Sequence, residues 1–301
     1  MFEEFKNAFD RHNNAHIQLI LINVIVYLAL AFIMVPMTMS GFDELFRALH
    51  DQIAIPARFS EYITRPWTII TYAFVHDLSG IFHILFNMLA LYWFGKLFVE
   101  YLGSDKLIAV YILGALAGGV FYLLAYNTIP FFNDQATQAH ITMVGASAAV
   151  DAIVVAAATL LPDYTFFLLF IGPVRIKYIA GIIVILSYLG TVGANAGGNI
   201  AHLGGALMGF IYIKQLQAGI NWGSWITLTL DWFKSLFKPK PKVKVTYRSD
   251  DVENYRKAAK SKGTGISQAE IDAILDKISA GGYESLSKEE KEKLFKASKK
   301  Q

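Results

Sequence analysis

The longest stretch without a charged side chain limits the fold more than any other feature of this sequence. No Asp, Glu, Lys or Arg occurs from Tyr178 to Ile213. A helix needs about 20 apolar residues to cross the hydrocarbon core of a bilayer, where charges are costly. The stretch is too long for one such helix, and GTVGANAGGN at 190–199 predicts a turn inside it. It therefore predicts two consecutive transmembrane helices.

Four further apolar runs precede this stretch. We expect membrane helices at 17–37, 79–98, 107–126 and 143–160. The composition agrees, because 17% of the residues are charged, against about 25% in soluble domains. The first run is longer than the apolar part of a signal peptide and is interpreted as a span. The sequence thus predicts an all-α membrane protein with six transmembrane helices.

The lysines and arginines predict the orientation of these helices. With the N-terminus inside, the cytoplasmic side receives Lys6, Arg11, Lys96, Lys106, Arg175, Lys177 and a basic C-terminal tail. The outer side receives only Arg47, Arg58 and Arg65, all in the first long loop. Because cytoplasmic loops carry the excess of positive charge, we expect both termini in the cytoplasm. The basic tail fits anionic lipid better than nucleic acid, so a lipid bilayer and no nucleic acid are the expected partners.

The predicted chain has five parts. They are an N-terminal segment at 1–16, a membrane domain at 17–216, an interfacial amphipathic helix at 217–238, a basic flexible linker at 239–264 and a small helical hairpin at 265–301. Trp222, Trp225 and Phe233 fall roughly on one face of the interfacial helix, as in helices that lie on a membrane. SQAE at 267–270 and SKEE at 287–290 fit capping boxes and predict the starts of the two hairpin helices.

Three polar motifs fall near the outer ends of the second, fourth and sixth spans. HILFN contains His83 and Asn87, GAS ends at Ser147, and AHLGG contains His202. These spans run in the same direction, which places the two histidines and the serine roughly 6–8 Å below the outer surface. Each motif alone has a structural explanation, because small and polar residues also join membrane helices to one another. Their shared depth favours a common site.

Together these motifs supply the groups of a serine nucleophile site. A serine hydroxyl needs a base, and histidine is the usual one. An oxyanion needs preorganised donors such as Asn, His or the backbone N–H groups of a helix N-terminus. The glycines around His202 allow its helix to approach the fourth span, so that the imidazole can reach Ser147.

HILFN with the upstream His76, GAS and AHLGG, in this order, resemble the motifs of the rhomboid family of intramembrane serine proteases. The resemblance covers about 60–216. It implies the six-helix rhomboid fold and cleavage of membrane-protein substrates at the outer end of the bundle. By this match Ser147 is the nucleophile, His202 is the general base, and Asn87 and His83 bind the oxyanion together with the Ser147 backbone N–H. His76 is matched as a loop-anchoring residue.

The resemblance also implies a multi-pass protein of a bacterial inner membrane that needs no cofactor and no metal. The C-terminal hairpin resembles a short tail domain of rhomboids from Bacteroidetes-like bacteria, and its partner is unknown. The absence of cysteine excludes a disulfide and a Cys-ligated metal site.

Three positions depart from the family pattern. Ala148 follows the serine where Gly is usual, and Arg65-Pro66-Trp67 stands in place of a Trp-Arg motif in the first loop. Asp151 stands where an aromatic residue is usual, on the same helix face as Ser147 and one turn away. Asp151 either orients His202 and stabilises its imidazolium, or is protonated and hydrogen-bonds a neighbouring helix. The sequence leaves both open.

Three other functions compete with proteolysis. A catalytically inactive rhomboid-like protein that binds or escorts membrane-protein clients would be expected to lack the Ser or the His, and both are present. A transporter with His83, His202 and Asp151 as a proton relay would be expected to show an inverted repeat. A zinc site of His76, His83 and His202 would be expected to show a clearer ligand cluster. The sequence therefore favours the serine protease.

Overall fold

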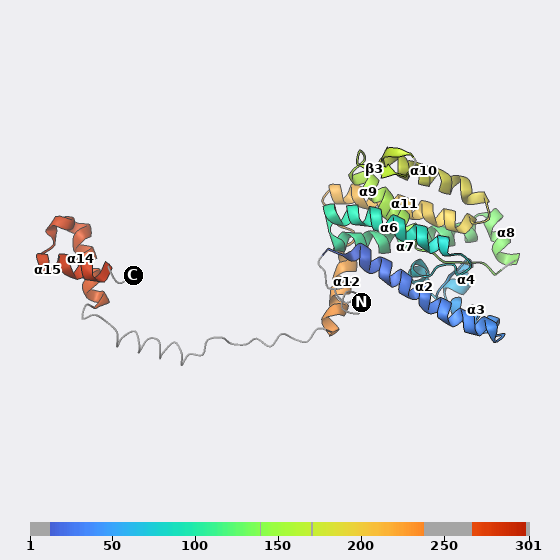
Figure 1. The fold of residues 1–301 in the computed structure, drawn as a ribbon, viewed down its shortest axis with the longest axis horizontal. Coiled ribbons are helices and arrows are strands. Elements are labelled where there is room, and N and C mark those ends of the chain that lie inside the picture. Colours follow the sequence, from blue (N-terminus) through green and yellow to red (C-terminus); the bar gives the residue numbers. More distant parts are fainter. Residues whose placement is uncertain (1–12, 139, 170, 238–266, 299–301) are drawn as a thin grey trace. The chain divides into compact units, whose positions relative to one another are not determined.

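The computed structural model describes residues 13–138, 140–169, 171–237 and 267–298, most of which are helical (Figure 1). The chain divides into two compact units, Met1–Phe237 and Lys238–Gln301. The predicted linker at 239–264 and most of the predicted N-terminal segment at 1–16 lie outside the described residues.

Each predicted span has a helical counterpart in the first unit. These helices are α2 (Ala15–Met39), α6 (Ile81–Leu102), α7 (Ser104–Thr128), α9 (Ser147–Leu160), α10 (Ile176–Leu189) and α11 (Ala196–Gln217). By length and composition, α2, α6 and α7 qualify as membrane-crossing helices among the described residues. The helices α9 and α10 are shorter, with 14 residues each. The count of six spans therefore stays a prediction.

The connections contain more regular structure than the sequence predicted. Between α2 and α6 lie α3 (Asp43–His50), β1 (Ile55–Pro56), α4 (Phe59–Tyr62), α5 (Thr68–Thr71) and the 3₁₀ helix η1 (Tyr72–Phe74). The polar connection at 127–140 contains α8 (Pro130–Gln138), and β2 (Thr142–Met143) pairs antiparallel with β1. Between α9 and α10, β3 (Thr165–Leu168) and β4 (Gly172–Arg175) form an antiparallel pair.

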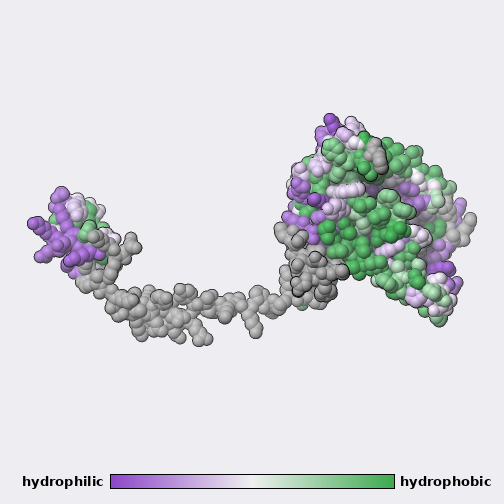
Figure 2. All heavy atoms as spheres, viewed as in Figure 1, coloured by the Kyte–Doolittle hydropathy of each residue, from purple (hydrophilic) through white to green (hydrophobic). Residues whose placement is uncertain are grey.

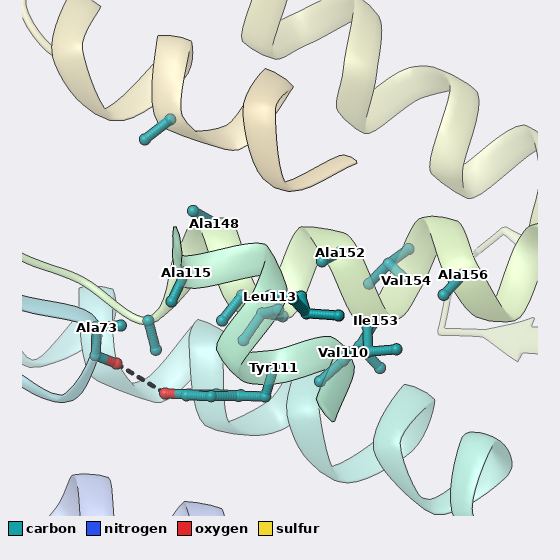
Figure 3. Packing of buried hydrophobic residues seen from close by; sticks show 14 of the residues in the cluster. Ala73, Val110, Tyr111, Leu113, Ala115, Ala148, Ala152, Ile153, Val154 and Ala156 are labelled. Atoms are coloured by element: carbon teal, nitrogen blue, oxygen red, sulfur yellow. Dashed lines mark hydrogen bonds between the residues drawn. The ribbon is translucent and has the colours of Figure 1, made fainter. Parts of the chain in front are cut away.

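Small residues bring α7, α9 and α11 into close contact. A Cβ added at Gly205 or Gly209 of α11 would meet the backbone of Ala148 or Ala152 on α9. Figure 3 shows the other side of α9, where Ile153 packs against α7. Glycine and alanine let membrane helices approach at backbone distance, which supplies dispersion contacts without large side chains. This packing places α9 in the centre of the unit.

Buried tyrosines fasten the segment before α6 to the helices. The Tyr72 hydroxyl donates to the Ala115 carbonyl oxygen at 2.7 Å. The Tyr111 hydroxyl donates to the Ala73 carbonyl oxygen, also at 2.7 Å (Figure 3), and the Asn23 amide donates to Tyr111 at 3.1 Å. Polar groups out of reach of water must find such partners. These bonds hold η1 at a fixed position beside α7.

A wide hydrophobic surface covers the first unit on the face drawn in Figure 2. Large apolar side chains such as Phe32 of α2, Phe82 of α6 and Leu186 of α10 are exposed. Soluble monomers rarely expose apolar patches above a few hundred Å². Helices that satisfy their own backbone hydrogen bonds can instead present such side chains to lipid.

The helix α12 (Ser224–Phe237) corresponds to the predicted interfacial helix. Its Ile226 is buried against the unit, whereas Trp225 and Phe233 are half exposed. An added Cβ at Gly223 would meet Ala109 of α7, so the start of α12 lies directly on that helix. The exposed tryptophans stay available for the membrane interface.

The second unit contains α14 (Gln268–Gly281), the 3₁₀ helix η3 (Tyr283–Ser285) and α15 (Lys288–Ser298). Both predicted capping boxes are confirmed. Glu270 accepts from the Ser267 backbone N–H at 2.9 Å and donates its own N–H to the Ser267 hydroxyl at 3.3 Å. Ser287 and Glu290 repeat the pattern at 2.8 and 3.3 Å.

Candidate functional site

Ser147 is the first residue of α9, and the turn before it requires glycine. Gly145 has φ = +141°, a region that side chains disfavour, and a Cβ there would lie 3.0 Å from His83 Cε1. Its N–H donates to the Tyr72 carbonyl oxygen at 3.0 Å, so η1 anchors the turn. The prediction that this helix starts near Met143 is wrong, because Met143 lies in β2 and is paired with Ile55. Ser147 thus opens its helix rather than lying a turn inside it.

The structure brings Ser147 and His202 together. His202 Nε2 lies 2.7 Å from Ser147 Oγ, a hydrogen-bond distance between residues on α9 and α11. The close approach at Gly205, one turn along α11, makes this contact possible, as the glycines around His202 predicted. A serine hydroxyl and a base within hydrogen-bond reach of each other form the arrangement that is diagnostic of an activated nucleophile.

Two oxygens face the other ring nitrogen of His202. Ser187 Oγ on α10 lies 3.4 Å from Nδ1, and Asp151 Oδ2 lies 3.6 Å from it. Both side chains are buried, with Ser187 at 5% and Asp151 at 9% exposure. Asp151 therefore lies near His202 at more than hydrogen-bond length, and both of its predicted roles stay predictions. Sequence reasoning missed Ser187, whose one signal was a hydroxyl within an apolar helix.

The predicted oxyanion residues, Asn87 and His83, line one cavity with the Ser147–His202 pair, called the dyad below. This cavity has a volume of about 360 Å³ and is lined by Asp151 as well. The Asn87 amide donates to the His83 carbonyl oxygen at 2.8 Å, which fixes its orientation. The first N–H groups of α9 have no partner inside the helix. Side-chain and backbone donors thus surround the space next to the Ser147 hydroxyl.

His76 is fully buried. Its ring packs edge-on against His83, with 5.3 Å between the centroids. Neither ring nitrogen has a hydrogen-bond partner among the described residues. The contact with His83 is the interaction through which His76 can hold the loop, and the anchoring role stays a prediction.

The alanine after the nucleophile fits because the facing helix is small there. Ala148 is buried, and a Cβ added at Gly118 of α7 would lie 2.6 Å from the Ala148 methyl. The methyl group therefore fills space that Gly118 leaves open. This departure from the family pattern does not place a side chain in the cavity next to Ser147, whose lining excludes Ala148.

Two family models and one relative match parts of this chain. The family model described as Rhomboid domain matches residues 64–217, and a second, described as a family of unknown function (DUF6576), matches residues 250–300. The chain is also similar to "RHOMBOID-like protein 12, mitochondrial" of Arabidopsis thaliana, with 32% identity over 159 residues, 50% of this chain and 47% of the relative. It therefore spans about half the length of that relative.

The rhomboid match covers half of the chain and contains every residue of the site described above. Among the described residues, no group of three or more His, Cys, Asp or Glu side chains is arranged to hold a metal ion. The apolar helices and the family together identify an integral membrane protein. The chain belongs to the rhomboid family.

Proposed function

We propose that this protein is an intramembrane serine endopeptidase that cleaves transmembrane segments of membrane proteins. The observation that carries the proposal is the 2.7 Å contact between Ser147 Oγ and His202 Nε2. The contact lies in a cavity among apolar helices, where an ionisable side chain is more often functional than structural.

The reaction follows from the positions of these groups. Ser147 Oγ attacks the scissile carbonyl carbon while His202 Nε2 accepts the hydroxyl proton. The resulting oxyanion is stabilised by the backbone N–H of Ser147, the second amide N–H of Asn87 and the His83 ring. His202 then donates the proton to the departing amine. A water molecule, deprotonated by His202, hydrolyses the acyl-enzyme and restores Ser147.

Asp151 and Ser187 complete the site by acting on His202 Nδ1. While Nε2 accepts a proton, Nδ1 must keep its own, and an oxygen facing Nδ1 favours that tautomer. Ser187 Oγ is the nearer acceptor at 3.4 Å, and Asp151 Oδ2 follows at 3.6 Å. An ionised Asp151 stabilises the imidazolium, whereas a protonated one only packs. We propose the ionised form during catalysis.

The membrane arrangement is part of the proposal. We assign six spans to α2, α6, α7, α9, α10 and α11, with both termini cytoplasmic in a bacterial inner membrane. The starts of α6, α9 and α11, which carry the site, then face the outer side. The second unit is assigned as a small helical hairpin, supported by its two capped helices. Substrate helices reach the cavity from the bilayer.

Proteolysis of a defined reporter tests the function. The full-length chain is reconstituted in liposomes with a single-span reporter that carries small residues near its outer end, and the products are identified by mass spectrometry. We expect cleavage within the span by the wild type and none by Ser147→Ala. Binding of the reporter without cleavage by the wild type would instead support a catalytically inactive client-binding protein.

A further inference from the structure

A second cavity adjoins the proposed catalytic cavity. It has a volume of about 550 Å³ and is bordered by the segments 141–144 and 194–198. His83 and Asn195 line both cavities, so the two are neighbours across these side chains. The volume falls within the range of about 300–1,000 Å³ that is typical of ligand pockets. The space is therefore large enough for side chains of a peptide bound at Ser147.

Asp77 gives this second cavity its charge. Among the described residues that line it, Asp77 is the acidic one, and no lysine or arginine lines it. Asp77 is exposed, and its two carboxylate oxygens accept from the Ser79 backbone N–H and hydroxyl, each at 2.8 Å. Partial burial by itself would raise the pKa of Asp77, but the bonds from Ser79 outweigh it and the pKa is lowered. The carboxylate is therefore ionised at neutral pH.

Three basic side chains lie near Asp77: Arg47 and His50 line a further cavity with it, and His83 lines the second cavity. Within the described ranges no lysine or arginine forms an ion pair with Asp77, and His50 and His83 are the titratable groups whose charges act on it. A carboxylate oxygen offers several acceptor sites, and Ser79 uses one on each oxygen. Asp77 can therefore accept further bonds from a cation inside the cavity.

We propose that Asp77 makes the second cavity a subsite for a lysine or arginine side chain of the substrate, within a few residues of the scissile bond. This inference rests on the proposed function and adds a substrate class to it. Lysine and arginine flank transmembrane segments at the membrane surface, where the proposed topology places this cavity. Lysine and arginine are less frequent at the outer ends of transmembrane segments. A lysine or arginine beside the scissile bond would therefore distinguish substrates from other membrane proteins.

Binding can be measured without catalysis by using the Ser147→Ala chain. Sets of three fluorescent single-span peptides are titrated in detergent micelles. Within a set the peptides share one sequence and carry Lys, Gln or Glu at one residue that flanks the small-residue site, and each set varies a different flanking residue. The same titrations are made with Asp77→Asn, which keeps an acceptor for Ser79, and with Asp77→Lys. Glu44→Gln is the matched control, because Glu44 is an exposed carboxylate of the same outer region that does not line the cavity.

At one or more positions we expect the Lys peptide to bind about five-fold more tightly than the Gln peptide, as for a partly exposed ion pair. Asp77→Asn removes this preference, Asp77→Lys transfers it to the Glu peptide, and Glu44→Gln leaves it unchanged. The proposal is overturned if the three peptides of every set bind equally to the chain with Asp77 intact. It is also overturned if the preference for Lys survives Asp77→Asn. Fluorophosphonate labelling of the chain with Ser147 intact tests catalysis separately, so the two failures are distinguishable.

Discussion

At the scale of single residues, the proposed mechanism depends on the two oxygens that face His202 Nδ1. We expect Asp151→Asn to lower kcat by about ten- to a hundred-fold with little change in KM, because it removes a negative charge 3.6 Å from the forming imidazolium. The loss is smaller than in a soluble triad, since Ser187 also faces Nδ1. Steady-state kinetics on the single-span reporter measures both constants. An unchanged kcat would show that Asp151 is a neutral packing residue.

Ser187 is tested by a pair of substitutions of different size. Ser187→Ala removes the acceptor 3.4 Å from His202 Nδ1, and we expect kcat to fall about ten-fold while thermal stability changes little. Ser187→Thr retains a hydroxyl and is expected to keep most of the activity. Equal activity of the Ala and Thr variants would assign Ser187 to helix packing alone.

At the residue scale, the sequence predicted some members of the candidate site and missed others. That Ser147, Asp151 and His202 lie together could be predicted, because their motifs share one depth on parallel spans and glycines around His202 permit a close approach. Their roles come from the resemblance to rhomboids. Ser187 could not be predicted, because its partner depends on how α10 packs on α11, which no short pattern encodes. Similarly, the packing of His76 on His83 follows from the loop before α6 and has no sequence signal of its own.

At the scale of elements, the contact between α9 and α11 positions the dyad. Gly205→Ala would press a methyl group into the backbone at Ala148, and we expect a loss of about 2 kcal/mol or more in stability, as in other overpacked cores. Loss of Ser147 labelling by a fluorophosphonate should accompany it, because the two helices must separate. Thermal unfolding in detergent measures the stability.

Gly181→Ala in α10 is the matched control for that substitution. A Cβ at Gly181 meets no atom within 4 Å, so we expect unchanged labelling and equal or higher stability. If both alanine variants behaved alike, close packing of α11 on α9 would not be what positions His202.

The capped helices of the second unit carry a pH dependence. The Ser287 backbone N–H and Lys277 hold the pKa of Glu290 at about 2, below its usual value of 4.5. A lowered pKa contributes stability above pH 4.5 that is lost as the pH falls towards 2. We therefore expect α15 to lose helical NMR chemical shifts in the full-length chain over this window.

Glu290→Gln is expected to make the shifts of α15 less sensitive to pH between 4.5 and 2. Glu289→Gln is the control, because the Glu289 side chain forms no hydrogen bond or ion pair with another described residue. A pH response equal in both variants would contradict the role given to Glu290.

Elements differed in how well the sequence predicted them. The apolar runs found α2, α6 and α7. Five of their six ends were predicted a few residues short, because helices extend into polar flanks that hydropathy does not mark, and the start of α6 was predicted two residues too early. The pairing of β1 with β2 joins residues far apart in the chain, so no local pattern predicts it. Because of this pairing and the glycine turn at Gly145, α9 begins at Ser147 and not near Met143, where its start was predicted.

At the scale of the whole molecule, the proposed topology places α3 outside and the α6–α7 connection inside. The chain has no cysteine, so single cysteines can be introduced without a further background substitution. We expect Glu44→Cys to react with a membrane-impermeant maleimide in intact spheroplasts, and Lys106→Cys to react only after permeabilisation. The reverse pattern would invert the membrane domain and place the dyad on the cytoplasmic side.

The central claim is that Ser147 is an activated nucleophile with His202 as its base. The most direct measurement is labelling of the purified full-length protein in detergent with a fluorophosphonate probe, comparing the wild type with Ser147→Ala and His202→Ala. We predict labelling of the wild type and loss of labelling in both variants, because the hydroxyl reacts only with its base 2.7 Å away. A folded wild-type protein that does not label, or a His202→Ala variant that labels as the wild type does, would contradict the claim.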